Sequence, residues 1–150
     1  MGSHIRESRI APLLWIAALL IVACSPCAPA ARAEVLKFVA TLDAMSEVPA
    51  NASSATGQAE FLYNTDTAQL TYTVVYDGLT GPATAGHIHG PAAPGSNAGI
   101  VVPFPVPASP ISGTATLQPA EAEALLAAML YVNIHTAANP AGEIRGQITR

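Results

Sequence analysis

The sequence predicts an all-β fold: a Greek-key β-sandwich or flattened barrel of about eight strands with one short helix, preceded by a signal segment. Three observations lead to this prediction. Short segments alternate between apolar and polar residues, which is the period of a half-buried strand. Clusters of Gly, Pro, Asn, Asp and Ser separate these segments. One segment alone has helical features, and the first 33 residues differ in composition from the rest.

Residues 1–33 have the order of a secretory signal peptide. Arg6 and Arg9 precede an uncharged apolar run of 14 residues (10–23), and Ala31-Arg32-Ala33 provides a small-residue cleavage site. The run is shorter than the roughly 20 residues that span a bilayer, so cleavage is favoured over an uncleaved anchor. Residues 1–4 resemble a remnant of a cloning vector. The domain is therefore expected at 34–150, in a periplasmic or secreted protein.

A second interpretation concerns Cys24. Residues 21–24 resemble a bacterial lipoprotein signal, in which this cysteine would be lipidated, whereas cleavage after Ala33 would remove both cysteines. The membrane is therefore a partner only through a signal anchor or a lipidated Cys24. No cysteine follows Cys27, so residues 34–150 have no internal disulfide, no thiolate metal site and no cysteine nucleophile.

The charge of residues 34–150 limits the partners. Three basic and nine acidic residues give a net charge of −6, and the basic residues form no run. Nucleic acid is not expected as a partner. A metal ion and another exported protein remain as partner classes.

The first half of the domain contains three expected strands. In residues 35–43 the side chains of 36, 38, 40 and 42 are apolar and share one face. Residues 57–63 and 69–76 are the next two strands. The turn-forming residues 64–67 between them predict a hairpin.

The second half contains five expected strands and the helix. The strands are residues 83–89, 99–106, 113–117, 131–136 and 143–149. Pro103, Pro105 and the adjoining Pro107 make 99–106 an edge strand or an extended strap. The helix is expected at 118–130, because Pro119 lies near its start and Glu121 and Glu123 in its first turn. Turn residues 137–142 separate the last two strands.

The only three histidines of the domain are His87, His89 and His135. His87 and His89 are two residues apart on a strand, so they share a face, and Ile88 points the other way. In the later strand, His135 shares a face with Asn133. If the isoleucines face the core, all three imidazoles lie on the solvent face of the sheet, and they converge if the two strands are close.

Three neutral imidazoles with an open position suit copper or zinc, and copper is favoured for an exported protein without thiolates. Asn133 and Glu143 would then surround the ligands, with Glu143 accepting an imidazole N–H and fixing its ring. Arg145 is a candidate guide for a small anion. The alternative is that the histidines hydrogen-bond loop carbonyls and that Glu143 and Arg145 form an exposed ion pair.

Several blocks of the sequence resemble the CHRD domain, which is named after chordin. They include His-Ile-His-Gly-Pro at 87–91, Asn-Ile-His-Thr at 133–136 and Gly-Glu-Ile-Arg-Gly at 142–146, within a resemblance that covers about residues 36–149. In chordin these domains belong to an extracellular antagonist of growth-factor signalling, and bacterial members are exported. The resemblance implies an extracytoplasmic all-β module and assigns no chemistry.

A weaker resemblance connects the three histidines and Arg145 with the copper–zinc superoxide dismutases, which are Greek-key β-sandwiches. It implies copper ligation by His87, His89 and His135, with Arg145 as the guide for superoxide. The sequence lacks a bridging fourth histidine, a zinc subloop and a cysteine pair. A copper-only dismutase and a metal-free structural or interaction module therefore stay open beside a copper-binding module. Imidazole nitrogens more than about 7 Å apart would favour the metal-free module.

Overall fold

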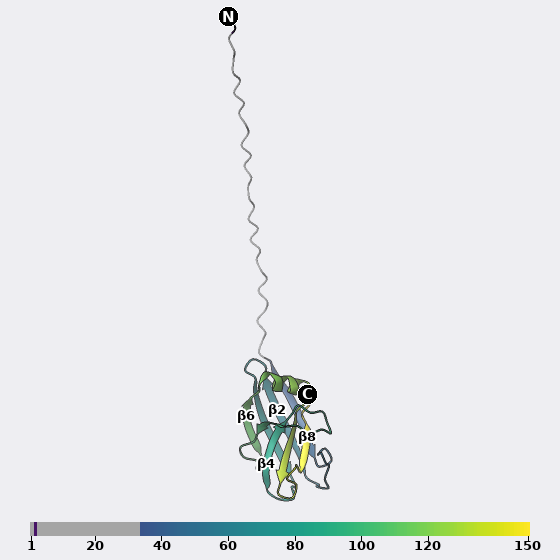
Figure 1. Cartoon of the computed structure of the whole chain (residues 1–150). Helices are drawn as coiled ribbons and strands as arrows, with labels where there is room; N and C mark the ends of the chain where they lie inside the picture. Colours follow the sequence, from purple (N-terminus) through teal and green to yellow (C-terminus); the bar gives the residue numbers. More distant parts are fainter. Residues whose placement is uncertain (1, 3–33) are drawn as a thin grey trace. The chain divides into compact units, whose positions relative to one another are not determined.

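The computed structural model describes residue 2 and residues 34–150. The predicted signal segment and Cys24 lie outside the described residues. Figure 1 shows strands that form one domain with a single helix among the described residues. The elements, in chain order, are β1 (Val35–Asp43), β2 (Thr56–Asn64), β3 (Gln69–Asp77), β4 (Ala83–His89), β5 (Ile100–Pro103), β6 (Ile111–Thr116), α1 (Pro119–Leu126), β7 (Tyr131–Thr136) and β8 (Ile144–Gln147).

The eight strands form one antiparallel sheet in the order β5-β4-β7-β8-β1-β2-β3-β6. The chain between β5 and β6 connects the two edges of this sheet. Phe104, directly after β5, packs its ring 4.9 Å from that of Tyr72 on β3. The Tyr76 hydroxyl, also on β3, donates a hydrogen bond of 2.6 Å to the Pro107 carbonyl. The sheet is therefore a nearly closed, barrel-like structure, and the predicted all-β class with about eight strands and one helix is confirmed.

A single apolar core fills the inside of the barrel. The even-numbered residues 36–42 of β1 are buried, while Val35, Lys37, Val39 and Thr41 are exposed, as the alternation predicts. The matching inward residues of the other strands include Phe61, Leu70, Val74, Ile88, Ile134 and Ile144. Because Ile88 and Ile134 point inward, the sequence positions next to them must face outward.

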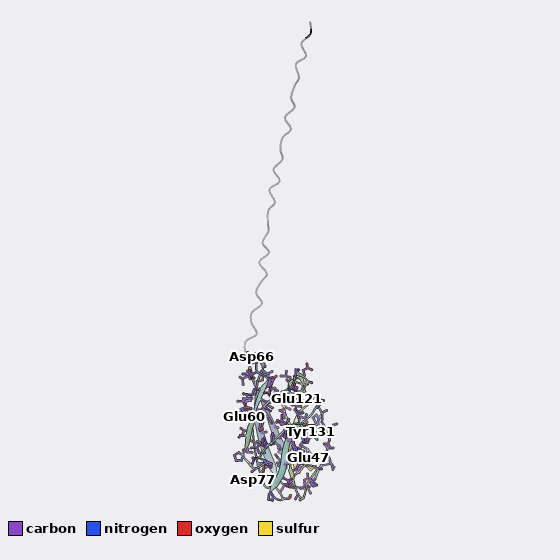
Figure 2. All side chains as sticks on the ribbon, turned by 60° about the vertical axis from the view of Figure 1, so that its left-hand side comes forward. Glu47, Glu60, Asp66, Asp77, Glu121 and Tyr131 are labelled. Atoms are coloured by element: carbon purple, nitrogen blue, oxygen red, sulfur yellow. The ribbon has the colours of Figure 1, made fainter. Side chains whose placement is uncertain are left out.

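Helix α1 lies at one end of the barrel. Asp66, in the β2–β3 turn, and Asp77, at the end of β3, lie at opposite ends of the domain (Figure 2). The Leu117 amide donates to the Ala68 carbonyl at 2.9 Å, which places the start of α1 beside this turn. No helix in the described part of the chain is long and apolar enough to cross a membrane.

Three elements differ most from their predicted bounds. The helix ends at Leu126 instead of residue 130, because Ala128 adopts a positive φ of 56° and Leu130 is fully buried beside the next strand. The proline-rich strand ends at Pro103, since the following residues leave the ladder to connect the sheet edges. The last strand is confined to Ile144–Gln147, although Glu143 and Ile148 still make backbone hydrogen bonds to the Ile134 and Leu130 carbonyls.

Candidate metal centre

Strands β4 and β7 bring the three histidines together. The two strands are antiparallel neighbours, with His87 opposite Asn133 and His89 opposite Tyr131. Ile88 and Ile134 are fully buried in the core, so the flanking histidines project from the outer face. The strand alternation in the sequence therefore predicted the correct face for all three imidazoles.

One ring nitrogen from each of His87, His89 and His135 lies within 4.8 Å of the other two. The closest pair is His87 Nδ1 and His135 Nε2, at 3.1 Å. Ligands bound at about 2 Å to one ion are at most about 4 Å apart, so the widest pair would have to close by roughly 1 Å. This spread is well below the 7 Å that would favour dispersed histidines.

Two backbone carbonyls determine which ring nitrogen is unprotonated in His89 and in His135. His89 Nδ1 lies 3.1 Å from the Ala98 carbonyl oxygen, and His135 Nδ1 lies 3.1 Å from the Pro140 carbonyl oxygen. A carbonyl only accepts, so each Nδ1 carries the proton and each Nε2 keeps its lone pair. The lone pair of His135 Nε2 then accepts a hydrogen bond from His87 Nδ1 in the metal-free protein. Proteins commonly orient histidine ligands of metals in this way.

The imidazoles are held in the neutral form that binds a metal. Burial lowers the pKa of His87 to about 4, and repulsion from His135 and His89 adds to this effect. Burial also lowers the pKa of His89 and of His135, although the carbonyl contacts act in the opposite direction. At neutral pH all three rings therefore have a lone pair available.

The histidine face is less exposed than the alternation suggests. His89 is buried, while His87 and His135 are partly buried. The segment 90–98 covers this face, and the Ala98 amide donates to the Tyr131 hydroxyl at 3.2 Å. The sequence predicted that the three histidines lie on an open, solvent-facing surface, and this is wrong in that the segment 90–98 covers them. Strand periodicity carries no information about how loops pack.

Arg145 anchors the same segment. Its guanidinium donates to the Ser96 carbonyl oxygen at 2.7 Å and to Asn97 Oδ1 at 3.0 Å, and its Cζ lies 3.4 Å from the centroid of the Tyr131 ring. The side chain is 1% exposed. The hypothesis that Arg145 guides an anion stays a prediction. The contacts of Arg145 with Ser96, Asn97 and Tyr131 are those of a buried side chain that holds the segment 90–98 in place.

The two polar residues predicted around the ligands have different neighbours. Asn133 Oδ1 lies 3.0 Å from His89 Nε2, so Asn133 contacts the cluster directly. The Glu143 carboxylate accepts hydrogen bonds from Ser53, Thr80 and Thr136, and the imidazole Nδ1 atoms contact Ala98 and Pro140 instead. Glu143 and Arg145 also form no exposed ion pair, since both are buried.

Two residues beside the cluster were not predicted. The Tyr131 ring stacks on His89 at 5.0 Å with an interplanar angle of 6°, and its position two residues before Asn133 indicates the shared face. Glu47 is 5% exposed, and burial raises its pKa to about 6, although contacts with Val48, Arg145 and Asn133 act in the opposite direction. Both side chains are labelled in Figure 2. Nothing in the local pattern around Glu47 indicates its burial.

The structure is an antiparallel β-barrel with three convergent imidazoles on the outer face of two neighbouring strands. It therefore belongs to the class of small all-β domains with a candidate metal centre. The chain belongs to the CHRD domain family, whose sequence pattern matches residues 38–148. No curated protein and no solved structure matches the chain. The family match covers the histidines, Asn133, Glu143 and Arg145.

Proposed function

We propose that this protein is an exported copper-binding CHRD module whose ion is held by His87, His89 and His135. The observation that carries the proposal is the approach of three ring nitrogens to within 4.8 Å of one another. The carbonyls of Ala98 and Pro140 add support, because they leave the Nε2 atoms of His89 and His135 unprotonated. Export rests on the signal-like sequence of residues 1–33.

The donor set favours copper, with zinc as the alternative. Imidazole nitrogen suits both ions, and for a given nitrogen site the affinity of Cu²⁺ exceeds that of Zn²⁺. No cysteine occurs after Cys27, so the domain has no thiolate that would select Cu⁺. A divalent ion is therefore the expected cargo.

Neither alternative function is favoured by an observation. A dismutase needs a path for an anion to the metal, but Arg145 is 1% exposed and donates to Ser96 and Asn97. A metal-free module has no need for three imidazoles that lie this close together and are held in the neutral form. We therefore propose binding, storage or electron transfer, and leave catalysis as a hypothesis.

Replacing His135 by Ala is expected to lower Cu²⁺ affinity by orders of magnitude, because one of three ligands is lost. The measurement is a Cu²⁺ titration in competition with a chromophoric chelator, followed by electron paramagnetic resonance (EPR). Every sample should carry His4→Ala, so that the only histidine outside the cluster cannot contribute. We expect one Cu²⁺ per chain before the His135 replacement.

The fold should survive this change, since His135 is only partly buried and lies outside the apolar core. Asn139→Ala is a matched control on the neighbouring turn, and it should leave Cu²⁺ affinity unchanged. Equal stoichiometry, affinity and spectra with and without His135 would refute the proposed site.

A further inference from the structure

Asn133 lies beside the histidine cluster and contacts one of its rings. It lies opposite His87 in the β4–β7 register and two residues before His135 on the same strand. Its Oδ1 is 3.0 Å from His89 Nε2, and the residue is 3% exposed.

The contact between Asn133 and His89 joins two acceptors. His89 Nδ1 faces the Ala98 carbonyl oxygen and must carry the ring proton, so Nε2 offers a lone pair. Asn133 Oδ1 offers lone pairs as well. Such a pair at 3.0 Å is stabilised when a positive charge lies between the two atoms. The separation is also close to the roughly 3.3 Å between neighbouring ligands of a tetrahedral ion.

Glu47 explains why the amide oxygen faces the histidines. The Glu47 carboxyl is buried, and the Asn133 side chain is among its polar neighbours. A carboxylate accepts hydrogen bonds and cannot donate them, so it attracts the NH₂ end of the amide. With the NH₂ end directed to Glu47, the oxygen of Asn133 is turned toward His89. Glu47 Oε1 is buried without a hydrogen-bond partner, so it is available to accept a bond from the Asn133 NH₂ group.

We propose that Asn133 Oδ1 is a fourth ligand of the metal and that Glu47 is the positioning residue that orients it. This inference rests on the proposed function of the three histidines. Three imidazole nitrogens with one neutral oxygen form a site for a divalent ion, since oxygen ligands suit harder ions than Cu⁺. The ion would then lie on the outer face of β4 and β7, beneath the segment 90–98.

Replacing Asn133 by Ala is expected to lower Cu²⁺ affinity by at least roughly 10-fold, because losing even a residue that only orients a ligand costs about 10- to 100-fold. The full chain with His4→Ala is titrated with Cu²⁺, and EPR is recorded with pulsed detection of the imidazole nitrogens. We expect the signals of three imidazoles to remain, while the copper hyperfine pattern changes because water replaces the amide oxygen. Asn133→Asp keeps the shape and an oxygen ligand, so it should bind Cu²⁺ at least as tightly as the parent.

Replacing Glu47 by Gln tests the positioning role. Glutamine can donate to Asn133 Oδ1, which removes the preference for one amide orientation. We expect an affinity between those of the parent and Asn133→Ala, with the parent EPR pattern retained in part. An unchanged affinity and spectrum for Glu47→Gln would refute its positioning role.

The outcomes separate the two proposals. If Asn133→Ala keeps the affinity and spectrum of the parent while His135→Ala loses Cu²⁺, Asn133 is not a ligand and the three-histidine site stands. If His135→Ala also keeps the parent values, both proposals fail. Thermal unfolding of each metal-free variant identifies any loss of Cu²⁺ affinity that comes from misfolding. If Asn133→Ala does not fold, the comparison of Asn133→Asp with the parent tests the proposal instead.

Discussion

Replacing Glu143 by Gln should lower the free energy of unfolding by about 3 kcal/mol at pH 7. The Glu143 side chain is fully buried, and it accepts four hydrogen bonds. The donors are Ser53 Oγ at 2.7 Å, the Thr80 amide at 2.8 Å, Thr80 Oγ1 at 2.7 Å and Thr136 Oγ1 at 2.6 Å. Burial alone would raise the pKa of Glu143, but these four bonds outweigh burial and lower it from 4.5 to about 2.

The size of the effect follows from this pKa. A difference of about 2.5 pKa units between the unfolded and folded states corresponds to about 3 kcal/mol in favour of the folded, ionised form. Glutamine has the same shape but presents an NH₂ group to a site that supplies donors. The Thr80 amide can only donate, so it would lose part of its acceptor.

The pH dependence of this contribution has a definite sign. Because the folded-state pKa is lowered, the stabilisation is fully present above pH about 4.5 and is lost as the pH falls toward about 2. The difference in unfolding free energy between the parent and Glu143→Gln should therefore shrink over this range. Other acids titrate in both proteins, so they cancel in the difference.

Urea unfolding at several pH values from 7 down to 2.5 measures the effect. Glu60→Gln is the control, because Glu60 lies exposed on β2 in an ion pair with Lys37 and should change stability by less than about 1 kcal/mol. A difference for Glu143→Gln that stays constant from pH 7 to pH 2.5 would contradict the lowered pKa of Glu143.

Strand alternation was sufficient to predict the faces of the sheet. The alternation around Ile88 and Ile134 placed the histidines outside the core, and the same reasoning gave the buried face of β1. This information is local, since each residue's face follows from its neighbours two positions away. The convergence of His87 and His135 needed one further fact, which is the pairing of β4 with β7.

The surroundings of the histidines could not be read from local patterns. Glu143 contacts Ser53 and Thr80, which are 90 and 63 residues away in the chain, so nothing near Glu143 indicates these hydroxyl partners. The sequence instead suggested an imidazole partner, because strand alternation around Ile144 placed Glu143 on the same outer face as the histidines. The covering of the cluster by segment 90–98 likewise depends on a loop without periodicity.

Replacing Arg145 by Ala should lower the unfolding free energy by roughly 3 kcal/mol. The change removes the guanidinium from the Tyr131 ring, a contact of about 2 kcal/mol when desolvated, and two hydrogen bonds to the segment 90–98. It also removes the positive charge that favours ionisation of the buried Glu47 carboxyl. Urea unfolding at pH 7 measures the loss, and a change below about 0.5 kcal/mol would contradict the anchoring role.

Arg145→Lys separates charge from shape. Lysine keeps the charge near Glu47 but loses the planar group that stacks on Tyr131 and reaches both Ser96 and Asn97. We expect about half the loss of the alanine variant. Amide hydrogen exchange should accelerate at Ala98 in both variants, because its amide is held by the Tyr131 hydroxyl. The Ala98 carbonyl orients His89, so Cu²⁺ affinity should fall together with the protection of the Ala98 amide from hydrogen exchange. If Arg145 only guides anions, neither the Cu²⁺ affinity nor the exchange rate of this amide should change.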